Sequence, residues 1–163
     1  MIRLIVNADD FGIDPWRNRG IAESFSGGIV TSASLLATGP AFADAVALAR
    51  RHYLPVGVHL NLAEGQPLSG PIPGLTGEGG RFPGKSASRR ILATEEIRPD
   101  ILRKELAAQI DRVFQAGLSP DHLDTHQHTF LLPQVAEAVV ATAGDFNIRR
   151  LRLPLPCEPA THD

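Results

Sequence analysis

The sequence has 163 residues, of which 43% are hydrophobic and 21% charged, typical of one globular domain large enough to bury a core. A formal net charge of −2, without a run of lysine or arginine, argues against a nucleic-acid partner. The apolar start at residues 2–6 is too short for a signal peptide, and no stretch reaches membrane-spanning length. We therefore expect a cytoplasmic protein without a membrane partner. The single cysteine, Cys157, excludes an internal disulfide framework and is interpreted as an ordinary thiol.

Short strand-like runs alternate with amphipathic helical patterns, which predicts βα units around a parallel sheet. The first helix is expected to begin at Asp14-Pro15, because a capping oxygen precedes a proline, and to end before Gly27-Gly28. Residues 64–98 are rich in glycine, proline and serine without a sustained apolar period, so we expect a long substrate or lid loop. The predicted strands are 4–6, 31–36, 56–62, 121–128 and 148–153, and the predicted helices are 14–25, 40–52, 99–116 and 132–143.

Three of the predicted strands carry residues that can ligate a metal at or near their ends. Asp9-Asp10 follows the first strand, His59 lies on the third, and His126 and His128 lie on the fourth. Taken singly, each is more often a capping or structural residue. Because the carboxyl ends of parallel strands share one face of a sheet, we expect these side chains to converge. One carboxylate and two imidazoles then match an open site for a divalent ion, with positions left for water and substrate.

The two adjacent aspartates would raise each other's pKa unless a cation or separate hydrogen bonds divided them. A division of roles resolves this conflict: one aspartate ligates the ion while the other takes a proton from water. Successive side chains of a strand point in opposite directions, so the doublet is expected to lie at a bend, for which Phe11-Gly12 provides the flexibility.

The fourth predicted strand would place Asp124, His126 and His128 on one face if it were extended. We interpret His126 as the ligand, Asp124 as an acceptor that orients an imidazole ring, and His128 as either a substrate contact or a packing residue. The remaining histidines are interpreted as structural or solvent-exposed: His52, His122 and His162.

Four segments resemble the YdjC-like carbohydrate deacetylases, and they occur in that family's order over nearly the whole chain. They are residues 6–12 (VNADDFG), 28–33 (GIVTSA), 57–62 (GVHLNL) and 122–128 (HLDTHQH). The resemblance implies a (β/α) barrel related to polysaccharide deacetylases. It also implies a metal-dependent hydrolase that removes acetyl groups from N-acetylated sugars of the chitooligosaccharide type, with a small carbohydrate as its partner.

By the same resemblance, Asp9 is the base for the attacking water beside one divalent cation. The implied ligands of that cation are Asp10, His59 and His126. Substrate binding, or support of the ligands, is expected of Asn61, Asp124 and His128. The family implies Mg²⁺, although two imidazoles and a carboxylate are also good ligands for Zn²⁺ or Mn²⁺.

A complete barrel usually needs at least about 200 residues, so the five strands predicted here imply an incomplete barrel. Residues from later strands, including the proton donor to the leaving amine, would then have no counterpart. Two alternatives stay open: a non-catalytic fragment that binds metal or sugar, and a metal-dependent hydrolase of another amide or ester. Because five strands cannot close a barrel, we expect the edges at 4–6 and 148–153 to associate with a second copy as a homodimer.

Overall fold

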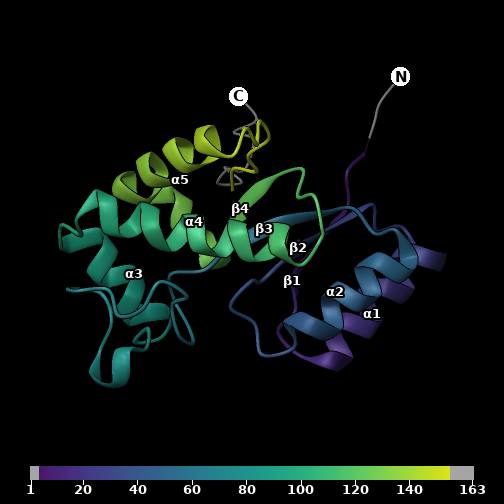
Figure 1. Ribbon diagram of the computed structural model, residues 1–163, viewed down its shortest axis with the longest axis horizontal. Coiled ribbons are helices and arrows are strands. Elements are labelled where there is room, and N and C mark those ends of the chain that lie inside the picture. Colours follow the sequence, from purple (N-terminus) through teal and green to yellow (C-terminus); the bar gives the residue numbers. More distant parts are fainter. Residues whose placement is uncertain (1–3, 155–163) are drawn as a thin grey trace, which may run out of the picture.

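The computed structural model describes residues 4–154, which form an α/β fold on a four-stranded parallel sheet (Figure 1). The sheet order is β1-β2-β3-β4, so each strand pairs with its neighbour in the chain. The strands are β1 (Asn7–Phe11), β2 (Ser32–Leu35), β3 (Val56–Leu60) and β4 (Leu123–Thr125). The prediction of an α/β fold with a parallel sheet is confirmed. Cys157 and His162 lie outside the described residues.

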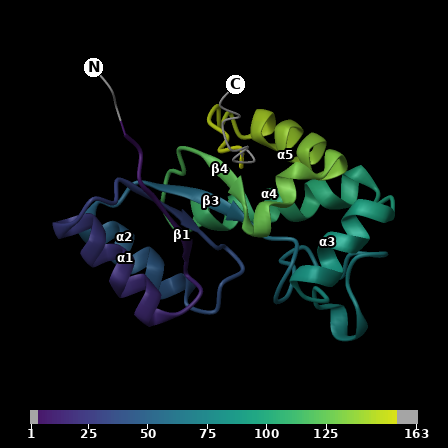
Figure 2. The same ribbon diagram turned by 180° about the vertical axis from the view of Figure 1, so that it is seen from behind.

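The helices form two groups, with α1 and α2 packed together beside β1 and with α3, α4 and α5 gathered apart from them (Figures 1 and 2). As predicted, α1 begins at Pro15, and Asp14 Oδ1 accepts a hydrogen bond from the Arg17 amide at 2.8 Å. None of the helices within residues 4–154 has the length and hydrophobicity of a membrane span. The helices are α1 (Pro15–Gly27), α2 (Phe42–His52), α3 (Lys85–Thr94), α4 (Pro99–Gln115) and α5 (Pro133–Asp145), with short 3-10 helices η1 (Glu78–Gly80) and η2 (His126–Leu131).

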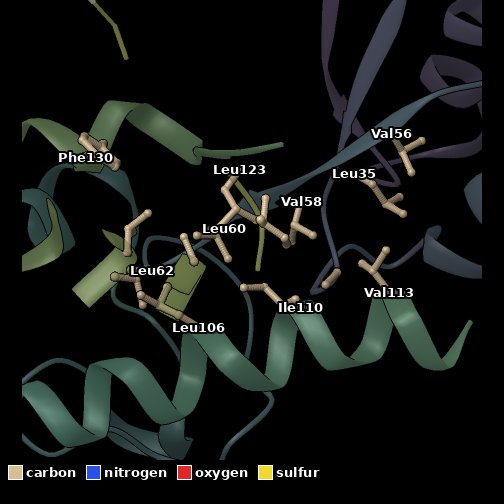
Figure 3. Close-up of a cluster of buried hydrophobic side chains, with 14 of the residues drawn as sticks. Leu35, Val56, Val58, Leu60, Leu62, Leu106, Ile110, Val113, Leu123 and Phe130 are labelled. Carbon is tan, nitrogen blue, oxygen red and sulfur yellow. The ribbon is translucent and has the colours of Figure 1, made fainter. Parts of the chain in front are cut away.

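The core lies between the sheet and α4. Leu106, Ile110 and Val113 of α4 are fully buried, and in Figure 3 they point from one side of the helix toward the buried side chains of the sheet. Their spacing of three and four residues places them on one face of the helix. All five residues of β3 are buried, as expected for an inner strand of a parallel sheet covered by helices. The strand that carries His59 is therefore enclosed in the core.

Two predicted strand boundaries near the ends of the sheet were wrong. The first strand is residues 7–11 rather than 4–6, and Leu4 and Ile5 are 77% exposed. Pairing with β2 decides this boundary, because Asn7 and Ala8 lie opposite Ser32 and Ala33. The predicted strand 148–153 is reduced to one parallel bridge between Leu123 and Leu151.

In two other segments the structure differs from the prediction because part of the chain is helical. The predicted strand 121–128 ends at Thr125, because Gln127 (φ 58°) and His128 (φ 55°) are left-handed and the chain enters η2. The segment 64–98 was predicted as an irregular loop, but it contains η1 and the ten-residue helix α3. Its role as a substrate loop stays a prediction. Its buried apolar side chains are Ile72, Leu75, Phe82, Leu92 and Ile97.

Gly57 of β3 leaves the space that the His122 ring fills. A Cβ at Gly57 would lie 2.4 Å from three ring atoms, and Asp121 holds that ring at 2.6 Å. Because the ring must move, we expect Gly57→Ala to lower the free energy of unfolding by about 1–3 kcal/mol in urea denaturation.

The matched control is Gly20→Ala on the exposed side of α1, where nothing lies within 4 Å of the new methyl group. In a helix this change should raise the free energy of unfolding by about 0.5–1 kcal/mol. Equal effects of the two substitutions would contradict the steric explanation for Gly57.

Candidate metal centre

The carboxyl ends of β1, β3 and β4 bring the three predicted ligands together. Asp10 lies on β1, His59 on β3 and His126 directly after β4, and one ligand atom from each lies within 4.8 Å of the others. Asp10 Oδ1 is 3.0 Å from His126 Nδ1 and 3.4 Å from His59 Nε2. The two imidazole rings meet edge to face, with centroids 5.3 Å apart. One carboxylate oxygen therefore lies between two ring nitrogens.

The bend that the aspartate doublet requires lies at Asp10 itself. Asp10 is left-handed (φ 63°), and the pairing of β1 with β2 shifts between Ala8 and Phe11. Such an irregularity breaks the alternation of side chains along a strand, and a short polar residue such as aspartate tolerates it better than most. Gly12 is also left-handed (φ 102°), but the register changes before it. Both aspartates can therefore face the same end of the sheet.

Asp124 orients the His59 ring from the side opposite Asp10. His59 Nδ1 lies 2.6 Å from Asp124 Oδ1, and the two residues are 3% and 2% exposed. Ser34 Oγ and Arg152 Nε donate to the other Asp124 oxygen, at 2.6 and 2.7 Å. With Nδ1 engaged, Nε2 is the nitrogen that His59 can present to a cation. A carboxylate on the far nitrogen is a frequent support of metal-binding histidines.

The protonation of these groups follows from their contacts. Burial lowers the pKa of His59, but hydrogen bonds with Asp10 and Asp124 outweigh it and raise the pKa to about 9. Burial raises the pKa of Asp124, but its contacts, led by that with His59, reverse the effect and leave the pKa lowered. Hydrogen bonds from His126 and His59 hold the pKa of Asp10 well below its usual range. At neutral pH, in the metal-free site, both carboxylates are ionised and His59 is a positively charged imidazolium.

Arg152 pairs with Asp9 next to the ligand cluster. Its Nη2 donates to Asp9 Oδ1 at 2.8 Å and also contacts Asp124. Asp9, His59 and Asp124 form a second group of possible ligands within 4.8 Å of one another, but the guanidinium already supplies a positive charge there. Burial lowers the pKa of the Arg152 guanidinium, but the carboxylates of Asp124 and Asp9 raise it by more. The net pKa lies above its usual value, so the guanidinium stays positively charged. The donor set therefore fits one divalent ion at Asp10, His59 and His126.

Two further predicted residues follow His59 and His126 by two positions each. Asn61 is buried, and its amide shapes the turn after β3: Oδ1 accepts from the Ala63 and Glu64 amides, and Nδ2 donates to Thr38 and to the Glu64 carbonyl. His128 is exposed, and the extended strand that would have aligned it with His126 does not form. It lines a cavity of about 90 Å³ together with Asp124, Thr125, Arg152, Leu153 and Pro154.

Sequence reasoning did not identify three charged residues at the site. Arg152 holds Asp9 and Asp124, Arg17 pairs with Asp10 Oδ2 at 2.9 Å, and Glu64 Oε2 lies 3.2 Å from His126 Nε2. Glu64 could have been found from its place two residues beyond the predicted strand that carries His59. Nothing in the spacing of the two arginines indicates which carboxylates they meet.

The sheet and the cluster at its carboxyl edge define an α/β protein with a candidate divalent-metal centre. The chain matches the model of the YdjC-like protein family over residues 3–162, and it belongs to that family. The resemblance found in the sequence is thereby confirmed.

Several similar proteins are named carbohydrate deacetylases. The chain is 43% identical to the carbohydrate deacetylase of Mus musculus over 158 residues, which are 94% of this chain and 51% of that protein. It is also 43% identical to the carbohydrate deacetylase of Geobacillus stearothermophilus over 152 residues, covering 93% and 58% of the two chains. The chain thus spans about half the length of these curated relatives.

Solved structures share the fold. The crystal structure of a proposed cellobiose-phosphate cleavage protein from Enterococcus faecalis superimposes with a TM-score of 0.80 at 32% identity, over 91% of this chain and 57% of the other. A lactam utilization protein from Thermus thermophilus has a TM-score of 0.58 at 19% identity and shows likeness of fold alone.

Proposed function

We propose that this chain carries the metal-binding part of a carbohydrate deacetylase, which hydrolyses the acetamide of an N-acetylated sugar. The observation that carries the proposal is the convergence of Asp10, His59 and His126 on one position. The names of the mouse and Geobacillus relatives support the reaction and the class of substrate. Asp9, beside this position, is the proposed base.

When bound, the divalent ion would supply Lewis acidity toward water and the acetyl carbonyl. Asp9 takes the proton from the attacking water. Arg152 Nη2 and Asn7 Nδ2 both donate to Asp9 Oδ1, at 2.8 and 2.9 Å, so we assign proton transfer to Oδ2. These two donors fix the carboxylate, and Arg152 also joins it to Asp124, which orients His59. The base and one ligand are thus positioned by the same guanidinium.

The finer parts of the proposal are a chitooligosaccharide-type substrate, Mg²⁺ as the ion, a cytoplasmic location and a homodimer. The mixed oxygen and nitrogen donors also suit Zn²⁺ or Mn²⁺. Exposed Leu4 and Ile5, which lead into the edge strand β1, support association with a second copy. Elemental analysis identifies the ion, and light scattering at low micromolar concentration identifies the oligomer.

Acetate release from N-acetylglucosamine oligomers tests the function directly. We expect release that a chelator stops and added divalent ion restores. Metal binding without acetate release would favour a non-catalytic metal- or sugar-binding chain. Release from an acetyl ester but not from the acetamide would change the substrate class while keeping the metal site.

Metal affinity is expected to rise with pH up to about 9. An imidazole must be neutral to bind a metal, and the pKa of His59 in the metal-free site is raised from 6.5 to about 9. Below that pH the ion must displace one proton, so the apparent affinity should increase about tenfold per pH unit. Zn²⁺ titration against a competing chelator measures this, and an affinity that does not change between pH 7 and pH 9 would contradict it.

A further inference from the structure

We propose that Glu64 is the positioning residue for His126: its carboxylate holds the Nε2–H of that ring, so that Nδ1 is the nitrogen offered to the ion. The inference rests on the metal binding proposed above. It assigns opposite ring nitrogens to the two histidine ligands and adds a residue from the 64–98 segment to the site.

The His126 ring lies between two carboxylates. Nδ1 is 3.0 Å from Asp10 Oδ1, and Nε2 is 3.2 Å from Glu64 Oε2. A neutral imidazole carries one N–H and one lone pair. If the lone pair of Nδ1 faces the shared position near Asp10, the proton must be on Nε2, where the carboxylate of Glu64 can accept it. The contact therefore selects one tautomer of the ligand.

His59 shows the same arrangement with its nitrogens exchanged. Its Nε2 lies 3.4 Å from Asp10 Oδ1, and its Nδ1 lies 2.6 Å from Asp124. Each ligand ring thus has a carboxylate on the nitrogen that faces away from Asp10. The two supports differ in depth, because the side chain of Asp124 is 2% exposed and that of Glu64 is 50% exposed. Water competes more strongly at Glu64, so its effect should be the smaller one.

The backbone of Glu64 is anchored from the core. Its amide donates to Asn61 Oδ1 at 3.1 Å, and its carbonyl accepts from Asn61 Nδ2 at 2.8 Å. Asn61 in turn exchanges two backbone hydrogen bonds, of 2.8 and 2.7 Å, with the fully buried Gln109 side chain of α4. Helix α4 therefore fixes the position of the Glu64 backbone through Asn61. The Glu64 carboxylate reaches His126 from this anchored turn and not from a free surface loop.

Gln127 is the competing group at the same nitrogen. Its side-chain Nε2 lies 3.2 Å from His126 Nε2. An amide nitrogen facing a ring N–H would be unfavourable, whereas the amide oxygen, after a flip of this group, could accept that hydrogen. Variants at Glu64 and Gln127 consequently separate the two possible partners.

The first test is nitrogen-15 NMR of histidine side chains in the full chain loaded with Zn²⁺, which is diamagnetic. We expect His126 to be bound through Nδ1 with a proton on Nε2, and His59 to be bound through Nε2. A Zn²⁺ complex in which His126 binds through Nε2 would overturn the inference and leave the metal site intact.

The second test is calorimetric titration with Zn²⁺. Glu64→Ala should weaken binding about tenfold, the lower end of the range for groups that support metal ligands. Glu64→Gln keeps an acceptor oxygen and should recover part of the loss, and Gln127→Met should cost less than Glu64→Ala. Glu96→Ala, which removes an exposed acid from the same segment, controls for the loss of charge and should not change the affinity.

The outcomes also separate this inference from the proposed metal site. Equal affinities of Glu64→Ala and Glu96→Ala, with His59→Ala strongly impaired, would overturn the role of Glu64 alone. Wild-type protein that binds no Zn²⁺, or binding unaffected by His59→Ala, would overturn both.

Discussion

Asp10→Asn should cost the protein its metal, whereas Asp9→Asn should leave the metal bound and abolish turnover. Asp10 Oδ1 is the atom between the two imidazoles, so replacing an anionic oxygen with an amide should weaken binding by more than the roughly 100-fold seen for supporting groups. Asp9 is held by Arg152 instead, and loss of a general base lowers kcat by about 10²–10⁴. Zn²⁺ titration and acetate release measure the two effects separately.

Asp111→Asn is the matched control, because it makes the same chemical change at an exposed position of α4. It should alter neither metal affinity nor turnover. If Asp9→Asn and Asp10→Asn lost metal equally, the division between base and ligand would be wrong and both aspartates would have to be ligands.

Of the substitutions proposed here, Asp124→Ala should cause the largest loss in the free energy of unfolding. Its buried carboxylate contacts His59, Ser34 and Arg152, and removal of one member of a buried charge network leaves the others unpaired, at a cost of about 3–5 kcal/mol. Metal affinity should also fall about 10- to 100-fold, because His59 loses its support. Urea denaturation and Zn²⁺ titration measure the two losses.

The pH dependence and an exposed control make the Asp124 prediction specific. The pKa of Asp124 is lowered in the folded state. The stability that its carboxylate contributes is therefore complete above the ordinary pKa range of aspartate and is lost as the pH falls below that range. The difference between wild type and Asp124→Ala should therefore narrow in acid, and also above about pH 9, where His59 loses the charge that Asp124 stabilises. Asp145→Ala removes an exposed carboxylate 2.7 Å from Arg103 and should cost about 0–1 kcal/mol. Equal losses at the two positions would contradict the role of burial.

The convergence of Asp10, His59 and His126 could be predicted because it depends on the general geometry of parallel sheets. Each residue lies at or near the end of an apolar run, and the carboxyl ends of such strands meet on one face. The limits of β1 could not be predicted in the same way. Residues 4–6 are more apolar than 7–11, but it is 7–11 that lie opposite β2, which is distant in the sequence.

The charge pairs and the bends at the site depend on contacts that local patterns do not contain. Arg152 meets Asp9 across 143 positions of sequence. The left-handed backbone of Gln127 and His128 interrupts a segment whose composition is typical of a strand. Helix α3 is only ten residues long and follows a stretch rich in glycine and proline, so its apolar period is too short to distinguish it from a loop.

The left-handed backbone at Asp10 restricts which amino acids the position can accept. Glycine would relieve the backbone but bring no ligand oxygen. Glutamate would keep the carboxylate, but it is longer by one methylene and lacks the short side chain that makes aspartate tolerable at positive φ. Asparagine suits the backbone but gives up the charge. Conformation and ligation eliminate different members of this set, and of the four only aspartate satisfies both. A mutational library selected for metal binding should thus favour aspartate over glycine, glutamate and asparagine at this codon.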